Sequence, residues 1–342
     1  MTLQHTKTLT VDQKKKPINE TSNPKQIILW IIHNLKFLFI PGSNLEELTY
    51  RQFRYELSFP KKHPLKRFKS PLFIIGSLLI FLLLTITIFP DWISPYTYYA
   101  ATVNEELYAF QHIYYPPSPL HPLGQTFRGL DVLARILFGA RPVVIFTLTA
   151  TLISCLVGIF IGAISAYYGR WLDAVLMRIM DIILSFPGVV FAVFVMLIWG
   201  SDYLILIITY SIIGVPYFAR IIRSNIVKEK ELPYIVAARV SGAKSFRIIF
   251  RHILPNCLLP LIVAASFNIA RNILSLAILG FLRISNIGWI EWGYDIALSL
   301  NRLYSATWAV FYPALMILLS SVGFLLFGDS LADIGLLRKE IL

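Results

Sequence analysis

The distribution of apolar and polar residues along the chain predicts six membrane-spanning segments. Six apolar stretches are separated by segments that carry most of the charged residues. A helix needs about 20 apolar residues to cross the hydrocarbon core of a bilayer, and most of these stretches approach that length. We therefore expect spans at about 71–90, 143–166, 179–200, 203–215, 258–281 and 308–327.

Two of these spans are predicted to depart from a straight helix that crosses the bilayer alone. Pro187 lies inside the third span and predicts a kink, because proline removes a backbone donor from the helix. The fourth span is too short to cross a bilayer alone. We expect it either to lean on neighbouring helices or to continue as a helix into the polar segment that follows.

The first 70 residues differ from the rest and predict a cytoplasmic extension. Residues 1–25 are polar and rich in lysine, as in a disordered tail. Residues 26–41 are apolar but shorter than a span, and polar residues such as Lys36 interrupt them. We expect an interfacial helix on the cytoplasmic leaflet there, with an additional span as the alternative. Ser43 and Glu46 have the spacing of a capping box that opens a further helix.

Composition places the chain in a membrane. Of its 342 residues, 56% are hydrophobic and 15% are charged, and the mean hydropathy is +0.67, which is too apolar for a soluble chain. The net charge is +12, and basic residues gather before the first span and after the fourth, which indicates cytoplasmic N- and C-termini. So little soluble surface argues against a nucleic-acid partner and for the lipid bilayer as surroundings. The predicted fold class is an all-α membrane protein.

The same order of segments predicts the organisation of the chain. Residues 71–90 form the first transmembrane helix, 91–140 an extracytoplasmic segment rich in aromatic residues and proline, and 141–328 the helical core. Residues 329–342 form a cytoplasmic tail. In the external segment between the last two spans, Trp289, Trp292 and Tyr294 suit the membrane interface.

One polar segment between the apolar stretches, residues 231–256, has a regular organisation of its own. Pro233 suits a first helical turn, where its missing N–H costs nothing, and Ala237 and Ala238 are strong helix formers. Gly242 predicts a sharp bend, since glycine adopts left-handed conformations without strain. We call this segment of two short helices around a bend the elbow. Its small residues would let another protein approach the backbone closely.

The second helix of the elbow is predicted to be amphipathic. Four apolar residues fall at positions i, i+3, i+4 and i+7, which share one helical face, while three basic residues lie off that face. We expect the apolar face to pack on the body of the protein and Pro255 to end the helix. On these patterns alone, an ordinary amphipathic loop is an equal alternative. The apolar residues are Phe246, Ile249, Phe250 and Ile253, and the basic ones are Lys244, Arg247 and Arg251.

The elbow resembles a known element of transport proteins. Its Ala-Ala pair, the glycine four residues later and the run His252-Ile-Leu-Pro-Asn are similar to the cytoplasmic EAA loop of permease subunits of ABC importers. The resemblance implies a coupling loop at about 217–256 that docks into a groove of an ATPase subunit. Val236 stands where that family has an acidic residue. The residues implied in coupling are Ala237, Ala238, Gly242, Ala243, Phe246, Arg247, His252 and Pro255.

A second stretch resembles the dipeptide, oligopeptide and nickel branch of the same family. The run from His121 to Arg141 is similar to that branch's "HPLGTD..GRDVLSR...GAR" motif and departs from it at Gln125, Thr126 and Leu130. The positions that match include Gly124, Asp131, Arg135, Gly139, Ala140 and Arg141.

The two resemblances imply a C-type permease with the six-helix type I importer fold. They also imply a second permease subunit, two ATP-binding subunits and an extracytoplasmic substrate-binding protein as partners in the cell (inner) membrane. ATP would be bound by the partner subunits, with no cofactor in this chain. A peptide is the implied substrate, and a nickel chelate, an opine or a sugar stays an alternative.

Arg271 falls near the middle of the fifth predicted span, where an unpaired charge costs about 2.5 kcal/mol or more. It is a candidate for the translocation path, where it would attract a substrate carboxylate. The alternative is an arginine satisfied by neighbouring carbonyls and amides, such as those of Asn268 or Asn272. At the cytoplasmic end of the third span, Arg178 and Asp181 have the i, i+3 spacing of a local ion pair, with a gating role as the alternative.

Catalytic and metal-binding patterns are absent from the sequence. The run Gly242-Ala-Lys-Ser lacks the earlier glycine of a phosphate-binding loop, so the chain is predicted not to be an enzyme and to have no ATPase site of its own. The isolated His252 has no ligand set around it, and Cys155 and Cys257 are expected to be inert packing residues. A stand-alone secondary transporter or channel is the main alternative function, and a membrane-embedded hydrolase is a weaker one.

Overall fold

The computed structural model describes residues 70–102, 113–284 and 289–339, with side chains described as far as residue 332. These residues belong to the unit His63–Leu342. The predictions for residues 1–69, among them the interfacial helix at 26–41 and the capping box, lie outside the described residues.

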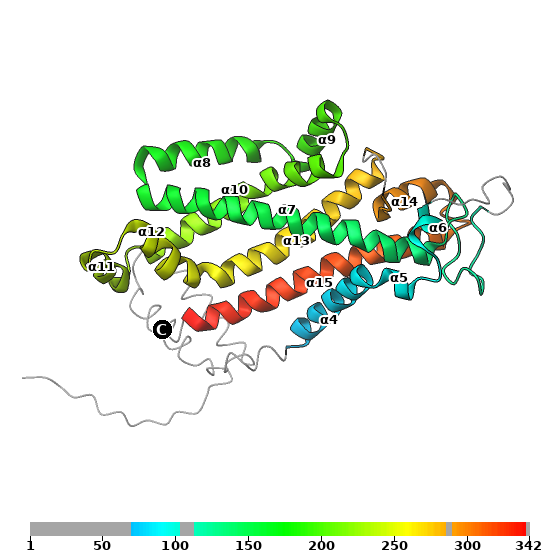
Figure 1. The fold of residues 1–342 in the computed structure, drawn as a ribbon, viewed down its shortest axis with the longest axis horizontal. Coiled ribbons are helices and arrows are strands. Elements are labelled where there is room, and N and C mark those ends of the chain that lie inside the picture. Colours follow the sequence, from blue (N-terminus) through cyan, green and yellow to red (C-terminus); the bar gives the residue numbers. More distant parts are fainter. Residues whose placement is uncertain (1–69, 103–112, 285–288, 340–342) are drawn as a thin grey trace, which may run out of the picture. The chain divides into compact units, whose positions relative to one another are not determined.

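The described ranges are helical, and apart from one isolated bridge between Gln125 and Asp131 they contain no β structure (Figure 1). The long helices are α4 (Pro71–Ile88), α7 (Val132–Tyr168), α10 (Tyr203–Glu229), α13 (Leu258–Phe281) and α15 (Thr307–Lys339). The shorter ones are α5 (Pro90–Ile93), α6 (Tyr98–Thr102), α8 (Arg170–Ser185), α9 (Gly188–Trp199), α11 (Pro233–Val240), α12 (Ser245–Arg247), η2 (Ile248–Ile253), η3 (Leu254–Cys257), α14 (Trp292–Ser299) and η4 (Leu300–Arg302).

Five of the six predicted spans are found as helices of membrane length, and the third, at 179–200, falls on two shorter helices. Within the described residues, five helices are long and apolar enough to cross a bilayer, and α8 with α9 makes a sixth if that bent pair is one span. The chain is therefore an all-α, multi-pass membrane protein. The continuous helix around the fifth span includes the second half of the elbow and runs from Ser245 to Phe281.

The lengths of several helices differ from the prediction. α7 begins at Val132 and not near residue 143, because the Asp131 side chain caps it by accepting from the Ala134 N–H at 2.7 Å. α10 continues to Glu229, which confirms that the short fourth span runs on into the polar segment. α15 likewise continues beyond residue 327 to Lys339.

The third predicted span is not one helix with a kink. α8 ends at Ser185, α9 begins at Gly188, and the two helix axes differ by 83°. Phe186 has extended backbone angles, as expected of a residue before proline, and Pro187 leads into α9. The sequence identified the position of the break but underestimated its size.

Close contacts between backbones hold the long helices together. A Cβ on Gly158 would lie 2.5 Å from the Phe218 Cβ, and a Cβ on Gly162 would lie 2.4 Å from the Ala219 carbonyl oxygen. Glycine therefore allows α7 and α10 to pack at a distance that no larger residue permits. α4 meets α15 in the same way, since a Cβ on Gly76 would lie 2.7 Å from a backbone nitrogen of α15.

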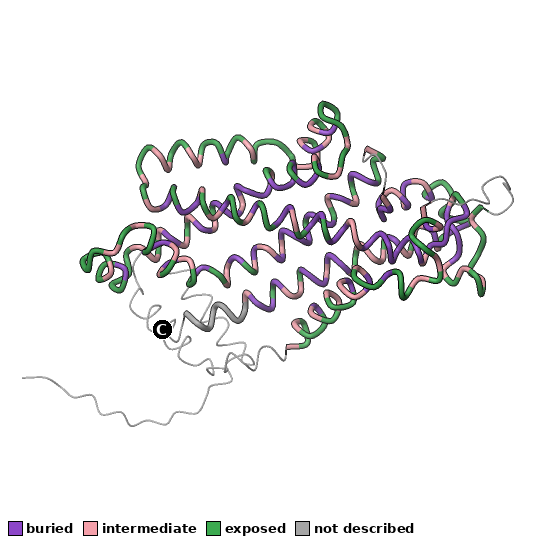
Figure 2. The backbone as a smooth tube through the Cα atoms, viewed as in Figure 1, coloured by how far each residue is buried: buried purple, intermediate pink, exposed green. Residues whose placement is uncertain are grey.

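Burial follows this packing. In Figure 2 the central helices alternate buried and exposed positions, whereas the outer faces of α8, α9 and α4 are largely exposed. One correction concerns Trp292, which was expected at the membrane interface. It is 1% exposed, and its ring N–H donates to the Ile136 carbonyl oxygen of α7 at 3.2 Å. It is thus a core residue that joins α14 to α7.

Candidate functional site

The bend of the elbow is a helix C-cap closed at Gly242. α11 (Pro233–Val240) ends there, and Gly242 has a φ of +82°, in the left-handed region. The Gly242 N–H donates to the Arg239 carbonyl oxygen and the Ala243 N–H to the Ala238 carbonyl oxygen, each at 3.0 Å. These two bonds form a Schellman motif, which reverses the chain within a few residues. The bend predicted at Gly242 is confirmed.

The inner side of the elbow is fixed to the long helices by a cluster of isoleucines. Ile235 of α11 and Ile248 and Ile253 of η2 are 0% exposed. They pack in one apolar cluster with Ile222 and Ile226 of α10 and with residues of α7 and α13. Because protein interiors are close-packed, a displacement of the elbow must displace these helices with it.

The apolar face of the second elbow helix differs from the predicted one. Ile249 and Ile253 are buried as expected, but Phe246 is 70% exposed and Ile248 takes its place in the core. The cause is the π-helical segment η2, whose wider turn shifts the face that an α-helical spacing predicts. Pro255 does not end the helix either, because η3 carries the chain directly into α13.

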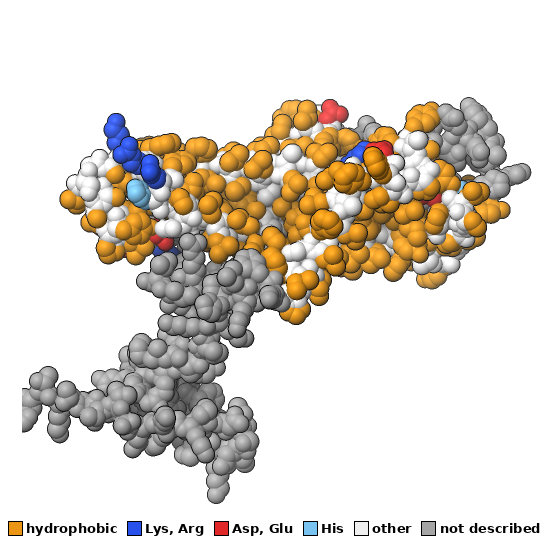
Figure 3. Space-filling view, turned by 60° about the horizontal axis from the view of Figure 1, so that its bottom comes forward, with side chains coloured by type: hydrophobic (Ala, Val, Ile, Leu, Met, Phe, Trp, Pro, Cys, Tyr) orange, Lys and Arg blue, Asp and Glu red, His pale blue; other side chains and the backbone are white. Residues whose placement is uncertain are grey.

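The outer side of the elbow is exposed and mixes apolar with basic residues. Val240 is 84% and Val236 is 47% exposed, Ala237 is exposed, and nothing lies within 4 Å of a Cβ placed on Gly242. Figure 3 shows Lys and Arg side chains gathered at the same end of the molecule, beside a surface that is otherwise mainly hydrophobic. The exposed basic residues of the elbow are Arg239, Lys244, Arg247 and Arg251.

The remaining predicted coupling residues are partly buried or exposed. Ala238, Ala243 and His252 are partly buried, and Pro255 is exposed. Val236, which stands where an acidic residue was expected, faces outward in the middle of α11, so it makes no cap for this helix. The structure thus brings the predicted residues together on one element, some in contact with the core and others open to a partner.

A hydrogen-bonded tyrosine ties the first elbow helix to the end of α10. The Tyr234 hydroxyl donates to Glu229 Oε2 at 2.5 Å and accepts from Asn256 Nδ2 at 3.0 Å. Burial, together with the hydrogen bond to Glu229, raises the pKa of Tyr234 to about 12, so its hydroxyl remains protonated and able to donate. No local pattern in the sequence predicts this contact, since Glu229 and Asn256 lie in different elements.

Ion pairs join α8 to α10 near the elbow. Asp173 accepts two hydrogen bonds from Arg223, at 2.6 and 2.5 Å, and a third from the Ser165 hydroxyl of α7. Asp181 pairs with Arg220 of α10 at 2.5 Å, so the local pair predicted between Arg178 and Asp181 is wrong. Both aspartates of α8 pair with arginines of α10 and not with a neighbour in their own helix, because α8 lies alongside α10 (Figure 1).

Arg271 lies near the middle of α13 and is exposed. Its guanidinium carbon lies 5.5 Å from the centre of the Tyr217 ring of α10, a cation–π contact. The amides that were expected to bond it face α7 instead, where Asn268 Oδ1 accepts from Thr151 Oγ1 at 2.9 Å. Asn272 Nδ2 donates to Thr151 Oγ1 and Asn268 Oδ1. In the described ranges Arg271 has no hydrogen bond or ion pair.

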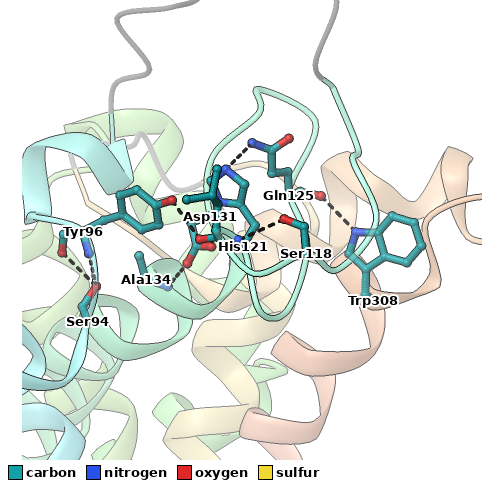
Figure 4. Close-up of polar contacts among 9 residues, drawn as sticks. Ser94, Tyr96, Ser118, His121, Gln125, Asp131, Ala134 and Trp308 are labelled. Atoms are coloured by element: carbon teal, nitrogen blue, oxygen red, sulfur yellow. Dashed lines mark hydrogen bonds and ion pairs between the residues drawn. The ribbon is translucent and has the colours of Figure 1, made fainter.

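The end of the molecule opposite the elbow holds a polar network around the motif that begins at His121. His121 Nδ1 lies 3.0 Å from Asp131 Oδ2, and Gln125 Nε2 lies 2.8 Å from His121 Nε2 (Figure 4). The Tyr96 ring stacks on His121, and burial together with the negative charge of Asp131 raises the pKa of Tyr96. The Trp308 ring N–H donates to the Gln125 carbonyl oxygen at 3.2 Å, which links the network to α15.

A buried ion pair lies beside this network. Arg135 of α7 donates to both carboxylate oxygens of Asp295 on α14, at 2.7 and 2.6 Å, and to the Ala101 carbonyl oxygen at 2.8 Å. Among the described residues, no group of three or more His, Cys, Asp or Glu side chains is placed to hold a metal ion. The polar contacts at this end join α7 to α14 through Arg135 and Asp295, and the network around His121 to α15 through Trp308.

The comparison with known proteins identifies the family. Residues 158–334, more than half of the chain, match the model of the binding-protein-dependent transport system inner membrane component. The chain belongs to this family. The match covers α10, the elbow and α13, so this protein is a transport permease of the type I importer fold.

Individual relatives cover most of the chain. The dipeptide transport system permease protein DppC of Alkalihalophilus pseudofirmus is 36% identical over 78% of this chain and 85% of its own length. The glutathione transport system permease protein GsiD of Pectobacterium atrosepticum is 31% identical, over 76% and 85%. The probable D,D-dipeptide transport system permease protein DdpC of Escherichia coli is 32% identical, over 78% and 87%. The family resemblance drawn from the elbow and from the motif at His121 is confirmed.

Proposed function

We propose that this permease imports peptides as one subunit of an ATP-driven transporter. It forms the translocation path with a second permease, receives substrate from an extracytoplasmic binding protein and works with two separate ATP-binding subunits. The elbow and both termini lie on the cytoplasmic side. The binding-protein-dependent family supports the assembly, and the basic residues around the elbow support its orientation.

The observation that carries the coupling proposal is the two-sided construction of the elbow. Its outer side exposes Ala237, Val240 and Gly242, small or apolar groups that a groove in another protein can cover. Its inner side buries Ile235 and Ile248 against α10 and α7. An element that is open to a partner on one side and packed on two long helices on the other is suited to pass on mechanical displacement.

The mechanism follows from this connection. When the two ATP-binding subunits close on ATP, the elbow, which is docked in a groove of one of them, moves with that subunit. The isoleucine cluster transfers the displacement to α10, and the continuous helix from Ser245 to Phe281 transfers it along α13. These helices then rock between inward-open and outward-open arrangements, because packed interfaces change in discrete steps. ATP is bound by the partner subunits, and this chain contributes no catalytic residue.

The relatives favour a peptide as the substrate. Two of them are named for dipeptides or D,D-dipeptides, and a third for glutathione, which is itself a peptide. Membership of a binding-protein-dependent family disfavours a stand-alone secondary transporter or channel, since such a protein needs no docking element.

Co-purification of the ATP-binding subunits tests the docking proposal. Gly242→Arg places a long charged side chain on the outer side of the elbow, where this chain itself leaves open space. We expect this variant to insert into the membrane and to lose the ATP-binding subunits, which the native chain retains.

Gly200→Arg is the matched control, because Gly200 also has a positive φ, +92°, and open space around a Cβ. It lies before the start of α10, a whole helix away from the elbow. The proposal fails if both variants retain the ATP-binding subunits as the native chain does, or if both lose them equally.

A further inference from the structure

We propose that Arg271 binds the carboxylate of the transported substrate part-way along the translocation path. The inference rests on the proposed function and adds to it the chemical group that this chain recognises. Its basis is one side chain in the middle of a predicted span, which is exposed and has no counter-ion among the described residues.

The position excludes an ordinary surface role. Arg271 lies ten residues before Phe281, the last residue of α13, which corresponds to about 15 Å along a helix axis. The cytoplasmic end of the span is at least as far away in the sequence. That distance exceeds the reach of an arginine side chain, so the guanidinium cannot extend to the lipid headgroups as residues near helix ends do. It must face water or protein.

Among the residues that the structure describes, none neutralises this charge. Asp173, Asp181 and Asp295 are each paired with another arginine, and the amides of Asn268 and Asn272 are engaged with Thr151. A charge placed at this depth without a counter-ion is costly, which makes Arg271 a site for an anion that the described part of this chain does not supply.

The contacts of the guanidinium leave it able to bind such an anion. The centre of the Tyr217 ring lies 5.5 Å from the guanidinium carbon, a cation–π contact. No hydrogen bond engages the guanidinium N–H groups within the described ranges, so they are available to an acceptor. Two parallel N–H groups match the two oxygens of a carboxylate, so a peptide's C-terminal carboxylate fits the site.

A carboxylate from another source has the same chemistry. An acidic side chain of the second permease would also pair with Arg271, and it would do so whatever substrate is carried. The experiment must therefore distinguish a contact made with the substrate from a contact made with the partner subunit.

The test compares two substrates that differ only in this group. The complete transporter with its binding protein is reconstituted in proteoliposomes, and uptake of dialanine and of dialanine amide is measured. The binding protein also discriminates between the two, but its contribution is the same for every permease variant. The acid-to-amide ratio of uptake rates in a variant, divided by the native ratio, isolates the contribution of the mutated side chain.

We expect Arg271→Gln to lower the acid-to-amide ratio about ten-fold, the loss of one charge-assisted pair, with the amide rate nearly unchanged. Arg271→Lys, which keeps the charge, should retain most of the ratio. Tyr217→Phe should behave as native because it keeps the ring, while Tyr217→Leu should lower the ratio several-fold.

Two results overturn the inference while leaving peptide import intact. One is a native complex that takes up dialanine with a ratio that Arg271→Gln does not change. The other is an equal loss of both substrates together with loss of the second permease on purification, which assigns Arg271 to the subunit interface. If the native complex takes up neither substrate, the peptide proposal fails and this inference fails with it.

Discussion

Arg135 and Asp295 show how much of this protein depends on single polar contacts. The two residues lie 160 positions apart and make a two-fold hydrogen-bonded ion pair that is almost completely buried. The motif beginning at His121 indicated that Arg135 matters, but nothing in the sequence pointed to Asp295 as its partner. Ion pairs of this kind follow from the arrangement of α7 and α14, which local patterns do not encode.

Removing one partner of this pair should be more damaging than removing both. We expect Arg135→Met to destabilise the protein by about 3–5 kcal/mol, because Asp295 would remain buried without a counter-ion. The double variant Arg135→Met, Asp295→Leu should be more stable than either single variant. Thermal unfolding of the detergent-purified chain measures this, and strictly additive losses would contradict the buried-pair interpretation.

At the scale of elements, the packing of α7 on α10 depends on glycine. Phe218 and Ala219 of α10 fill the space that side chains at Gly158 and Gly162 would occupy. The sequence marks these two glycines only as residues within an apolar stretch. Their spacing of four places them on one face of α7, where α10 crosses.

A single methyl group at this crossing should separate the two helices. Gly162→Ala would place its Cβ 2.4 Å from the Ala219 carbonyl oxygen, and since backbone cannot move aside cheaply, we expect a loss of about 1–3 kcal/mol. Gly188→Ala is the control, because its Cβ would approach only the Ile213 side chain, at 3.3 Å. The melting temperatures of the two purified variants test this prediction. Equal shifts in both would show that the loss of stability does not come from the α7–α10 contact.

The sequence predicted where the helices lie better than how they end and bend. Long apolar stretches are a direct consequence of the bilayer, so five spans were located as single helices, and the third corresponds to the bent pair α8 and α9. The 83° break before α9 and the π-helical turn of η2 depend on contacts with other helices. For that reason Pro187 was predicted as a mere kink, and Phe246 was assigned to the core in place of Ile248.

For the whole molecule, the elbow and Arg271 lie on one connected set of helices. Ile235 and Ile248 anchor the elbow to α10, and α10 supplies Tyr217, whose ring contacts Arg271 of α13. A displacement that begins at the elbow can thus reach the proposed carboxylate site through packed helices alone. The candidate coupling residues were predictable because they adjoin one another in the sequence, whereas the pairing of Tyr217 with Arg271 needed the fold.

Direct contact between the elbow and an ATP-binding subunit is the central claim, and site-specific photo-crosslinking in the native membrane tests it most directly. A photoreactive amino acid replaces Ala237, which is exposed on the outer side of the elbow, and, as a control, Gly200 at the opposite end of α10. Position 237 should crosslink to the ATP-binding subunit and position 200 should not. A fully inserted, transport-active complex in which position 237 gives no such product would contradict the account.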